Sequence, residues 1–355
     1  MFKNIENNLL TKNNEKIYEI CKENNEINLG KFFMDILDKR KNEFNDIISK
    51  NEEENMKNIK IFVMCNWCTS KDLCILWNKM SKKGEWNGIE LSYEFPADYY
   101  LIINSATYEP IFERMLKIIE PEKTIIFHME PNITSNKNLW KEWSNIGKRF
   151  PNLYYLGSHE NCVNNIEWHL SYTYKDLSSI DFSKYKKDEN KYVISTIMSS
   201  KYSDLGHKKR INFLKYLEDK GMDIHVYGSN HFNWKNYKGE LPPYCKEKGL
   251  VPYYYTFNAE NCKKKNYLTE KLIDGILCDT LTFYWGCENL EDILPSDCCV
   301  VLELKDFEKD YYKVKECLDN FEWYNKIKQM RKAKDKILNE LQLFPKLEKI
   351  VKRKY

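Results

Sequence analysis

The segment from Tyr254 to Gly286 restricts the fold most strongly, because it reads as a strand, a polar loop, a helix and a second strand in direct succession. An apolar helix-like run, Leu272–Cys278, follows the polar loop, and a strand-like run, Leu281–Gly286, comes next. In α/β proteins with parallel sheets, the loop between a strand and the following helix lines the ligand-binding crevice. The segment therefore predicts an α/β protein with a binding site near residues 257–271.

The start of the expected helix carries residues that suit an anionic or sugar ligand. Free N–H groups and the positive end of the helix dipole favour a phosphate at such a position. Lys271 can pair with a phosphate, and Glu270 can accept hydrogen bonds from sugar hydroxyls. The alternative is a solvated first turn that is capped by Thr269 or Asn266.

Three elements of this segment occur in a fixed order: Phe257-Asn-Ala-Glu-Asn261, Tyr267-Leu-Thr-Glu-Lys271 and Tyr284-Trp-Gly286. In order and spacing they resemble the signature of the α1,3-fucosyltransferase family, glycosyltransferase family 10. The resemblance is strong over residues 250–310, weaker but collinear over roughly 58–250, and absent from the first 55 residues. It implies a divergent member with the GT-B fold, in which two Rossmann-like domains face a cleft. It also implies transfer of a sugar from a nucleotide donor to a glycan.

The resemblance further implies roles for residues of the second half. Asn261 and Tyr267 match the donor-binding asparagine and tyrosine of the family, and Glu260 matches the glutamate before that asparagine. For Glu260, a structural carboxylate held by a salt bridge is an equally good interpretation. Arg210 takes the position of an arginine that contacts the diphosphate.

Gly228 and Ser229 form a further candidate pair in the same half. They come at the end of a strand-like run, Asp223–Gly228. Because glycine lets the backbone approach a ligand closely, we expect this pair near the nucleotide.

An inverting glycosyl transfer also needs a base that deprotonates the acceptor hydroxyl, besides groups that stabilise the departing diphosphate. Glu130 is the candidate base, since it follows the strand-like run 123–129 and resembles the carboxylate that family members place after a strand. His128 is the rival, although a lone histidine in an apolar strand is more often a core residue. Trp67, Trp86 and Trp140 are candidates for stacking on an acceptor sugar.

Composition excludes several classes of function. Lys and Arg number 56 against 53 Asp and Glu, a formal charge of +3, which does not indicate a nucleic-acid-binding protein. The sequence has no Asp-x-Asp motif, so we expect no metal between carboxylates and diphosphate, and no cofactor. Nucleotide sugar and glycan acceptor are the expected partners.

The N-terminus lacks the apolar core of a signal peptide, and no apolar run of about 18 residues occurs. The sequence therefore favours a soluble cytoplasmic protein whose 12 cysteines are mostly free thiols. Cys65-Asn-Trp-Cys68 has the spacing of a thioredoxin-like motif, which keeps a thiol-redox function open as a weaker alternative.

Alternating strand-like and helix-like runs predict four regions. Residues 1–56 are expected to form a helical extension that docks weakly or mediates self-association. Residues 57–188 form the acceptor domain, 189–320 the nucleotide-sugar domain, and 321–355 are helices that pack back toward the first domain.

Two questions stay open at this level. The resemblance favours GDP-fucose as the donor, with a UDP-N-acetylhexosamine as the rival. A non-catalytic glycan-binding or scaffold protein that kept the fold is the alternative from another class.

Overall fold

A computed structural model describes residues 58–105, 116–147, 154–157, 167–185 and 191–352. These residues belong to a compact unit that spans Asn58–Tyr355, distinct from the unit Met1–Lys57. The helical extension predicted for residues 1–56 lies outside the described residues.

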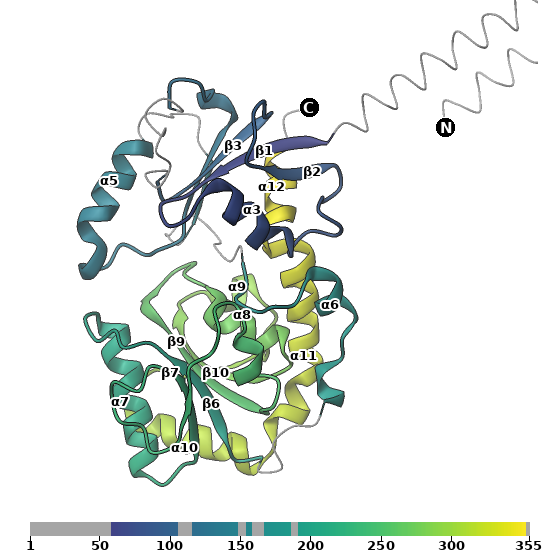
Figure 1. The fold of residues 1–355 in the computed structure, drawn as a ribbon. Coiled ribbons are helices and arrows are strands. Elements are labelled where there is room, and N and C mark those ends of the chain that lie inside the picture. Colours follow the sequence, from purple (N-terminus) through teal and green to yellow (C-terminus); the bar gives the residue numbers. More distant parts are fainter. Residues whose placement is uncertain (1–57, 106–115, 148–153, 158–166, 186–190, 353–355) are drawn as a thin grey trace, which may run out of the picture. The chain divides into compact units, whose positions relative to one another are not determined.

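The first half of this unit contains five parallel strands in the order β2-β1-β3-β4-β5 (Figure 1). Every residue of β3 and β4 is buried, which is typical of central strands in a parallel sheet covered on both faces. The strands are β1 (Ile59–Met64), β2 (Ile89–Ser92), β3 (Tyr99–Ile103), β4 (Thr124–His128) and β5 (Tyr154–Gly157). The helical elements are α3 (Ser70–Asn78), η1 (Pro121–Lys123), η2 (Thr134–Asn136), α5 (Lys137–Gly147), α6 (Tyr174–Ser179) and η3 (Phe182–Lys184).

The second half contains six parallel strands in the order β11-β10-β9-β6-β7-β8. They are β6 (Ile194–Met198), β7 (Ile224–Gly228), β8 (Tyr237–Gly239), β9 (Tyr255–Lys264), β10 (Leu281–Cys287) and β11 (Val300–Val301). The helical elements are α7 (Leu205–Asp219), η4 (Lys246–Gly249), α8 (Glu270–Leu277), α9 (Leu290–Ile293) and α10 (Phe307–Asp319). Gly221 follows the last residues of α7 with a φ of +83°, a conformation in which glycine commonly ends a helix.

The chain ends in α11 (Glu322–Lys336), a π-helical turn η5 (Ile337–Leu341) and α12 (Leu343–Val351). Side chains of this last part contact the segment that joins α3 to β2. Trp86 donates from Nε1 to a Glu348 carboxylate oxygen at 2.9 Å, and Gln342 donates to the carbonyl oxygen of Met80 at 3.2 Å. The described residues include no helix with both the length and the apolar character needed to cross a bilayer.

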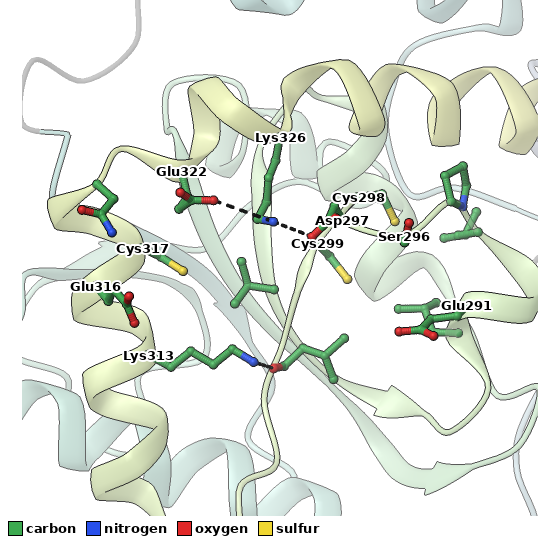
Figure 2. A pocket seen from close by; sticks show the side chains of 16 residues that line it. Glu291, Ser296, Asp297, Cys298, Cys299, Lys313, Glu316, Cys317, Glu322 and Lys326 are labelled. Atoms are coloured by element: carbon green, nitrogen blue, oxygen red, sulfur yellow. Dashed lines mark hydrogen bonds and ion pairs between the residues drawn. The ribbon is translucent and has the colours of Figure 1, made fainter.

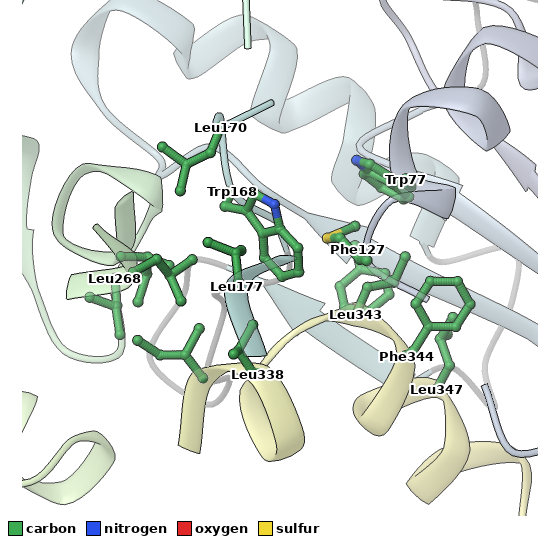
Figure 3. Packing of buried hydrophobic residues seen from close by; sticks show 14 of the residues in the cluster. Trp77, Phe127, Trp168, Leu170, Leu177, Leu268, Leu338, Leu343, Phe344 and Leu347 are labelled. Atoms are coloured by element: carbon green, nitrogen blue, oxygen red, sulfur yellow. The ribbon is translucent and has the colours of Figure 1, made fainter. Parts of the chain in front are cut away.

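A large apolar cluster draws side chains from both halves and from the final helices (Figure 3). Trp77, Phe127 and Trp168 are fully buried in it, together with Leu268 of the second half and Phe344 of α12. Each large side chain buried in this way stabilises the fold by roughly 1.5–3 kcal/mol. The cluster therefore supports both sheets with one set of contacts.

Strand β9 corrects one sequence prediction. The polar residues between the first strand and the helix were expected to form a loop, but β9 extends through many of them to Lys264. Its parallel pairing with β10, from Tyr255 opposite Leu281 to Ala259 opposite Trp285, holds the polar residues in a strand. Pairing with the neighbouring strand thus fixes the positions of the signature residues in β9.

Candidate active site

One cavity lies beside α9, α10 and α11 and has a volume of about 400 Å³ (Figure 2). In its wall, Lys326 pairs with Asp297 at 2.6 Å and with Glu322 at 3.7 Å. Cys298, Cys299 and Cys317 also line it, but no metal-ligand set occurs among the described residues. No signature residue lines this cavity.

The second cavity has a volume of about 340 Å³ and collects charged residues from both halves. Its lining comprises Glu130, His169, Ile197, Met198, Ser199, Lys201, Arg210, Lys246, Leu250, Asn258, Ala259, Asn261, Glu270, Lys271 and Asp274. Five of the predicted site residues are therefore brought together here: Glu130, Arg210, Asn261, Glu270 and Lys271.

Glu260 lies beneath this cavity and is fully buried. Its carboxylate accepts hydrogen bonds from the backbone N–H of Thr269 at 2.9 Å and from the Thr269 hydroxyl at 2.7 Å. Tyr284 donates its hydroxyl to the same carboxylate at 3.2 Å, and Lys271 forms an ion pair with it at 3.5 Å. Of the two interpretations of Glu260, the geometry thus favours the structural one: the carboxylate positions the start of α8.

Two glycines permit the close packing around Glu260. A Cβ on Gly286 would lie 2.3 Å from Cγ of Glu260, so only glycine leaves room for that side chain. A Cβ on Gly206 would lie 2.3 Å from the carbonyl oxygen of Asn261. Gly206 therefore lets α7 rest against β9, and Arg210, four residues later, lies on the same face of that helix.

A chain of alternating charges runs along one side of the cavity. Glu270 accepts through Oε1 from Lys246 at 3.2 Å and from Lys271 at 3.3 Å. Lys246 also pairs with Asp274 at 3.4 Å, one turn further along α8. Although burial opposes ionisation, the two lysines hold the pKa of Glu270 well below its usual range. No described residue bonds to Oε2 of Glu270, which leaves that oxygen as an acceptor toward the cavity.

Arg210 differs from these lysines because no carboxylate pairs with it in the described part of the chain. Its side chain is 6% exposed and donates to the Ser199 hydroxyl at 2.9 Å and to Oδ1 of Asn261 at 3.4 Å. Its Nε has no hydrogen-bond partner among the described residues. Burial lowers the pKa of Arg210, yet a guanidinium stays charged in proteins. A buried, unpaired cation at a cavity wall is a strong indication of an anionic ligand.

Glu130 lies at the carboxyl end of β4 and reaches the cavity from the first half. Its surface is accessible from the cavity, but the surrounding protein raises the pKa of its carboxyl, and the charge of Lys271 opposes that rise. His128, the rival base, is 2% exposed and packs against Trp140 and Trp143. His128 is therefore a core residue that does not line the cavity.

A glutamate–histidine pair that the sequence analysis did not identify also borders the cavity. His169 places Nε2 3.0 Å from Oε1 of Glu167, whose Oε2 accepts from the indole of Trp77 at 2.8 Å. Burial and Lys246 lower the pKa of His169, but Glu167 and Glu270 outweigh them and raise it above its ordinary value. The backbone N–H of His169 also donates to Asp274 at 2.9 Å, which ties this segment to α8.

Besides Glu260, three of the predicted donor-binding residues do not line the cavity. Tyr267 is 1% exposed and belongs to the protein interior. Gly228 has a φ of +89°, and a Cβ at this position would lie 2.3 Å from the carbonyl oxygen of Met198. The local backbone packing therefore requires glycine here. Ser229 follows it and accepts a hydrogen bond from the backbone N–H of His231.

The Cys65/Cys68 pair lacks the electrostatics of a thiol-redox site. Burial and the neighbouring Cys65 thiol raise the pKa of Cys68 to about 12, whereas a reactive cysteine needs a lowered pKa. The backbone N–H of Cys68 donates to the Cys65 sulfur at 3.4 Å. The pair closes a tight turn after β1.

Part of the chain is similar to a known protein family. Residues 184–336 match the model of glycosyltransferase family 10 (fucosyltransferase), C-terminal part. This match supports the resemblance that the signature indicated, and the protein is a glycosyltransferase.

Solved structures show the fold of this glycosyltransferase. An α-glucosyltransferase in complex with UDP and a 13-mer DNA containing an HMU base is 13% identical, with a TM-score of 0.53 over 83% of this chain and 99% of that chain. An α1,3-fucosyltransferase with GDP-fucose is 16% identical, with a TM-score of 0.45 over 81% of this chain and 92% of that chain. The predicted GT-B fold is confirmed. No curated protein sequence matches the chain.

Lys246 and His169, two cavity residues that sequence reasoning missed, come from segments without a recognisable motif. Each contacts a residue of α8 that is distant in the chain: Lys246 bonds to Glu270, and His169 to Asp274. Asp274 did carry a signal: an acidic residue four positions after Glu270 in an otherwise apolar helix shares a face with it.

Proposed function

We propose that the protein is an inverting, metal-independent glycosyltransferase that moves a sugar from a nucleoside-diphosphate donor to a hydroxyl of a glycan. GDP-fucose is the first donor to test, and a UDP-N-acetylhexosamine is the second. The observation that carries the proposal is Arg210, a buried guanidinium without a carboxylate partner in the described part of the chain.

The charge balance of the cavity supports a diphosphate as the missing partner. Lys246 and Lys271 are neutralised by carboxylates, whereas Arg210 has only the neutral partners Ser199 and Asn261. An arginine fork matches the geometry of phosphate oxygens and forms strong, charge-assisted hydrogen bonds with them. Lys201, which is exposed at the same cavity, adds a second available cation.

In the proposed reaction, Glu130 accepts the proton of the acceptor hydroxyl. The oxygen of that hydroxyl attacks the anomeric carbon of the donor sugar, and the bond from this carbon to the diphosphate oxygen breaks. The diphosphate leaves with the bonding electrons and is stabilised by Arg210 and Lys271. Because attack and departure take place on opposite faces, the anomeric configuration inverts.

Metal independence is part of the proposal, since cationic side chains can supply the charge that a metal supplies elsewhere. The raised pKa of Glu130 suits a base, because a carboxyl with a pKa closer to the working pH takes a proton more readily. Glu270 is proposed to accept hydroxyl hydrogen bonds from ribose or sugar through Oε2. Asn261 is proposed to hold the guanidinium of Arg210 in place.

A thermal-shift screen tests the proposal with GDP, UDP, ADP, CMP and their common sugars. A ligand that binds the folded state alone raises the melting temperature by mass action. A rise with GDP and GDP-fucose supports the first donor, and a rise with UDP-sugars alone replaces that donor. Absence of any rise would contradict a nucleotide-sugar site and favour a non-catalytic glycan-binding protein.

A further inference from the structure

The loops after β1, β3 and β4 lie at one edge of the first sheet and are locked together by a single side chain. Asn104 is 4% exposed and has a φ of +57°, a conformation that asparagine adopts more readily than most residues. Its Nδ2 donates to Oδ1 of Asn66 at 3.3 Å, and its Oδ1 accepts from the backbone N–H of Met129 at 2.9 Å. This amide bridge fixes the loop of Trp67 relative to the loop of Glu130.

Strand register gives the separation of these two loops. Met64 of β1 lies opposite Ile102 of β3, which lies opposite Ile126 of β4. Strands β1 and β4 are thus two strand spacings apart, about 10 Å. A short oligosaccharide can span that distance along the sheet edge.

Trp67 differs from every other tryptophan of the chain in its exposure. It is 39% exposed, whereas each of the other eight of the nine tryptophans is at most 8% exposed. The turn that carries it is closed by sulfur contacts, since Cys65 donates to the carbonyl oxygen of Cys68 at 3.2 Å and accepts from its N–H at 3.4 Å. The two sulfur atoms lie 3.5 Å apart on either side of Trp67 in the sequence. The Cys-x-x-Cys motif therefore serves to present an aromatic side chain.

Tyr244 connects this turn with the cavity. Its ring lies edge-on to His169 at 5.0 Å, and the ammonium of Lys79 lies 4.8 Å from its ring centre. Lys79 caps the end of α3, the helix that follows the turn. A half-buried aromatic residue thus contacts both the end of α3 and the wall that holds His169.

We propose that the Cys65–Cys68 turn and Tyr244 form an acceptor subsite in which Trp67 stacks on the face of a pyranose ring. This inference rests on the proposed function and extends it, because it assigns the ligand class and the residues of the acceptor side. The apolar face of a sugar ring suits an exposed indole, and its rim hydroxyls suit polar groups such as Tyr244. The next residue of the glycan then reaches Glu130.

The test uses the full chain with the nucleoside diphosphate that stabilises it best. Saturation-transfer NMR is recorded with methyl β-galactopyranoside, methyl β-N-acetylglucosaminide and N-acetyllactosamine as probes. The variants are Trp67→Ala, Trp67→Phe and, as a matched control, Tyr324→Ala, an aromatic residue of α11 that is 69% exposed. Nucleotide affinity is measured for each variant.

At least one pyranoside is expected to show saturation transfer from the wild type and from the control. Trp67→Ala should raise the Kd or KM of that sugar about three- to tenfold at unchanged nucleotide affinity, and Trp67→Phe should recover part of the loss. If the wild type binds nucleotide but no pyranoside, or if Trp67→Ala binds the sugar as tightly as the wild type, the subsite is overturned. If the wild type binds no nucleotide, the proposed function itself fails.

Discussion

The two walls of the cavity are built in contrasting ways. On the wall from the second half, Glu260, Thr269, Glu270 and Lys271 form one continuous network of hydrogen bonds and ion pairs. On the wall from the first half, the carboxylate of Glu130 has no hydrogen bond or ion pair with a described residue. The first of these walls is held by contacts among its own residues, whereas the second presents a carboxylate that is available to exchange a proton.

The same contrast between the two walls appears in the pKa values of Glu270 and Glu130. Lys246 and Lys271 keep the pKa of Glu270 well below its usual range, while burial raises the pKa of Glu130. Two carboxylates of one cavity whose pKa values are driven apart are suited to different tasks. Glu270 stays an anionic acceptor, and Glu130 can exchange a proton.

The largest expected effect comes from removing the free carboxylate. Glu130→Gln should lower kcat by about 10²–10⁴-fold, because the acceptor hydroxyl loses its base, and should leave donor affinity unchanged. Initial-rate kinetics and a donor titration measure the two quantities. Glu142→Gln, on the exposed face of α5, is the control. A full rate in Glu130→Gln would remove this residue from catalysis.

On the networked wall, Lys271→Met should affect stability as well as donor binding. It leaves the fully buried Glu260 without its ion-pair partner, which costs about 3–5 kcal/mol in comparable buried pairs. It also removes a cation from the proposed diphosphate site, so donor affinity falls. Urea unfolding and a donor titration check both effects. Unchanged stability would show that the ion pair contributes nothing to the fold.

Glu260→Gln should have a smaller effect, because glutamine keeps an oxygen that accepts from Thr269. We expect a loss of about 1–3 kcal/mol of stability and a weaker donor affinity through a displaced Lys271. Asn258, two residues before Glu260 on β9, lines the cavity directly, so the effect of Asn258→Ala shows what loss of a cavity-lining side chain costs without the displacement of Lys271. If Glu260→Gln changed donor affinity without changing stability, a direct contact with the donor would be indicated instead.

The smallest effect is expected from the pH dependence of stability at the Glu167–His169 pair. His169 has a raised pKa, so its contribution is complete below its ordinary value of 6.5 and is lost as pH rises through the raised value. Glu167 has a lowered pKa, so its contribution is present above 4.5 and is lost only as pH falls through the lowered value. The stability difference between wild type and His169→Gln should therefore be complete below about pH 6.5 and shrink as pH rises through the raised pKa of His169. A constant difference, measured by thermal unfolding, would show that the pair does not titrate in this range.

Much of the fold could be predicted from the sequence because its strands are buried apolar runs. The strand-like run that begins at Lys123 contains β4, and the run Asp223–Gly228 contains β7. The edge strands β2 and β8 were not predicted, since short and partly exposed strands have no continuous apolar pattern.

The site was only partly predictable for a different reason. Glu130, Arg210 and Lys271 follow from a signature and from their places at strand and helix ends. Lys246 and His169 reach the cavity from loops whose neighbours are set by the packing of both halves. No local pattern in the sequence encodes that arrangement, so the residues that pair with Glu270 and Asp274 become evident only in three dimensions.

The most direct test of the account is a calorimetric titration of GDP, or of the nucleoside diphosphate selected by thermal shift, into the wild type and Arg210→Lys. Lysine keeps the charge and loses the fork that contacts Ser199 and Asn261. The account predicts a Kd at least about tenfold higher in Arg210→Lys, with an unchanged circular dichroism spectrum. Equal affinity in the two proteins would contradict the assignment of the buried guanidinium to the diphosphate.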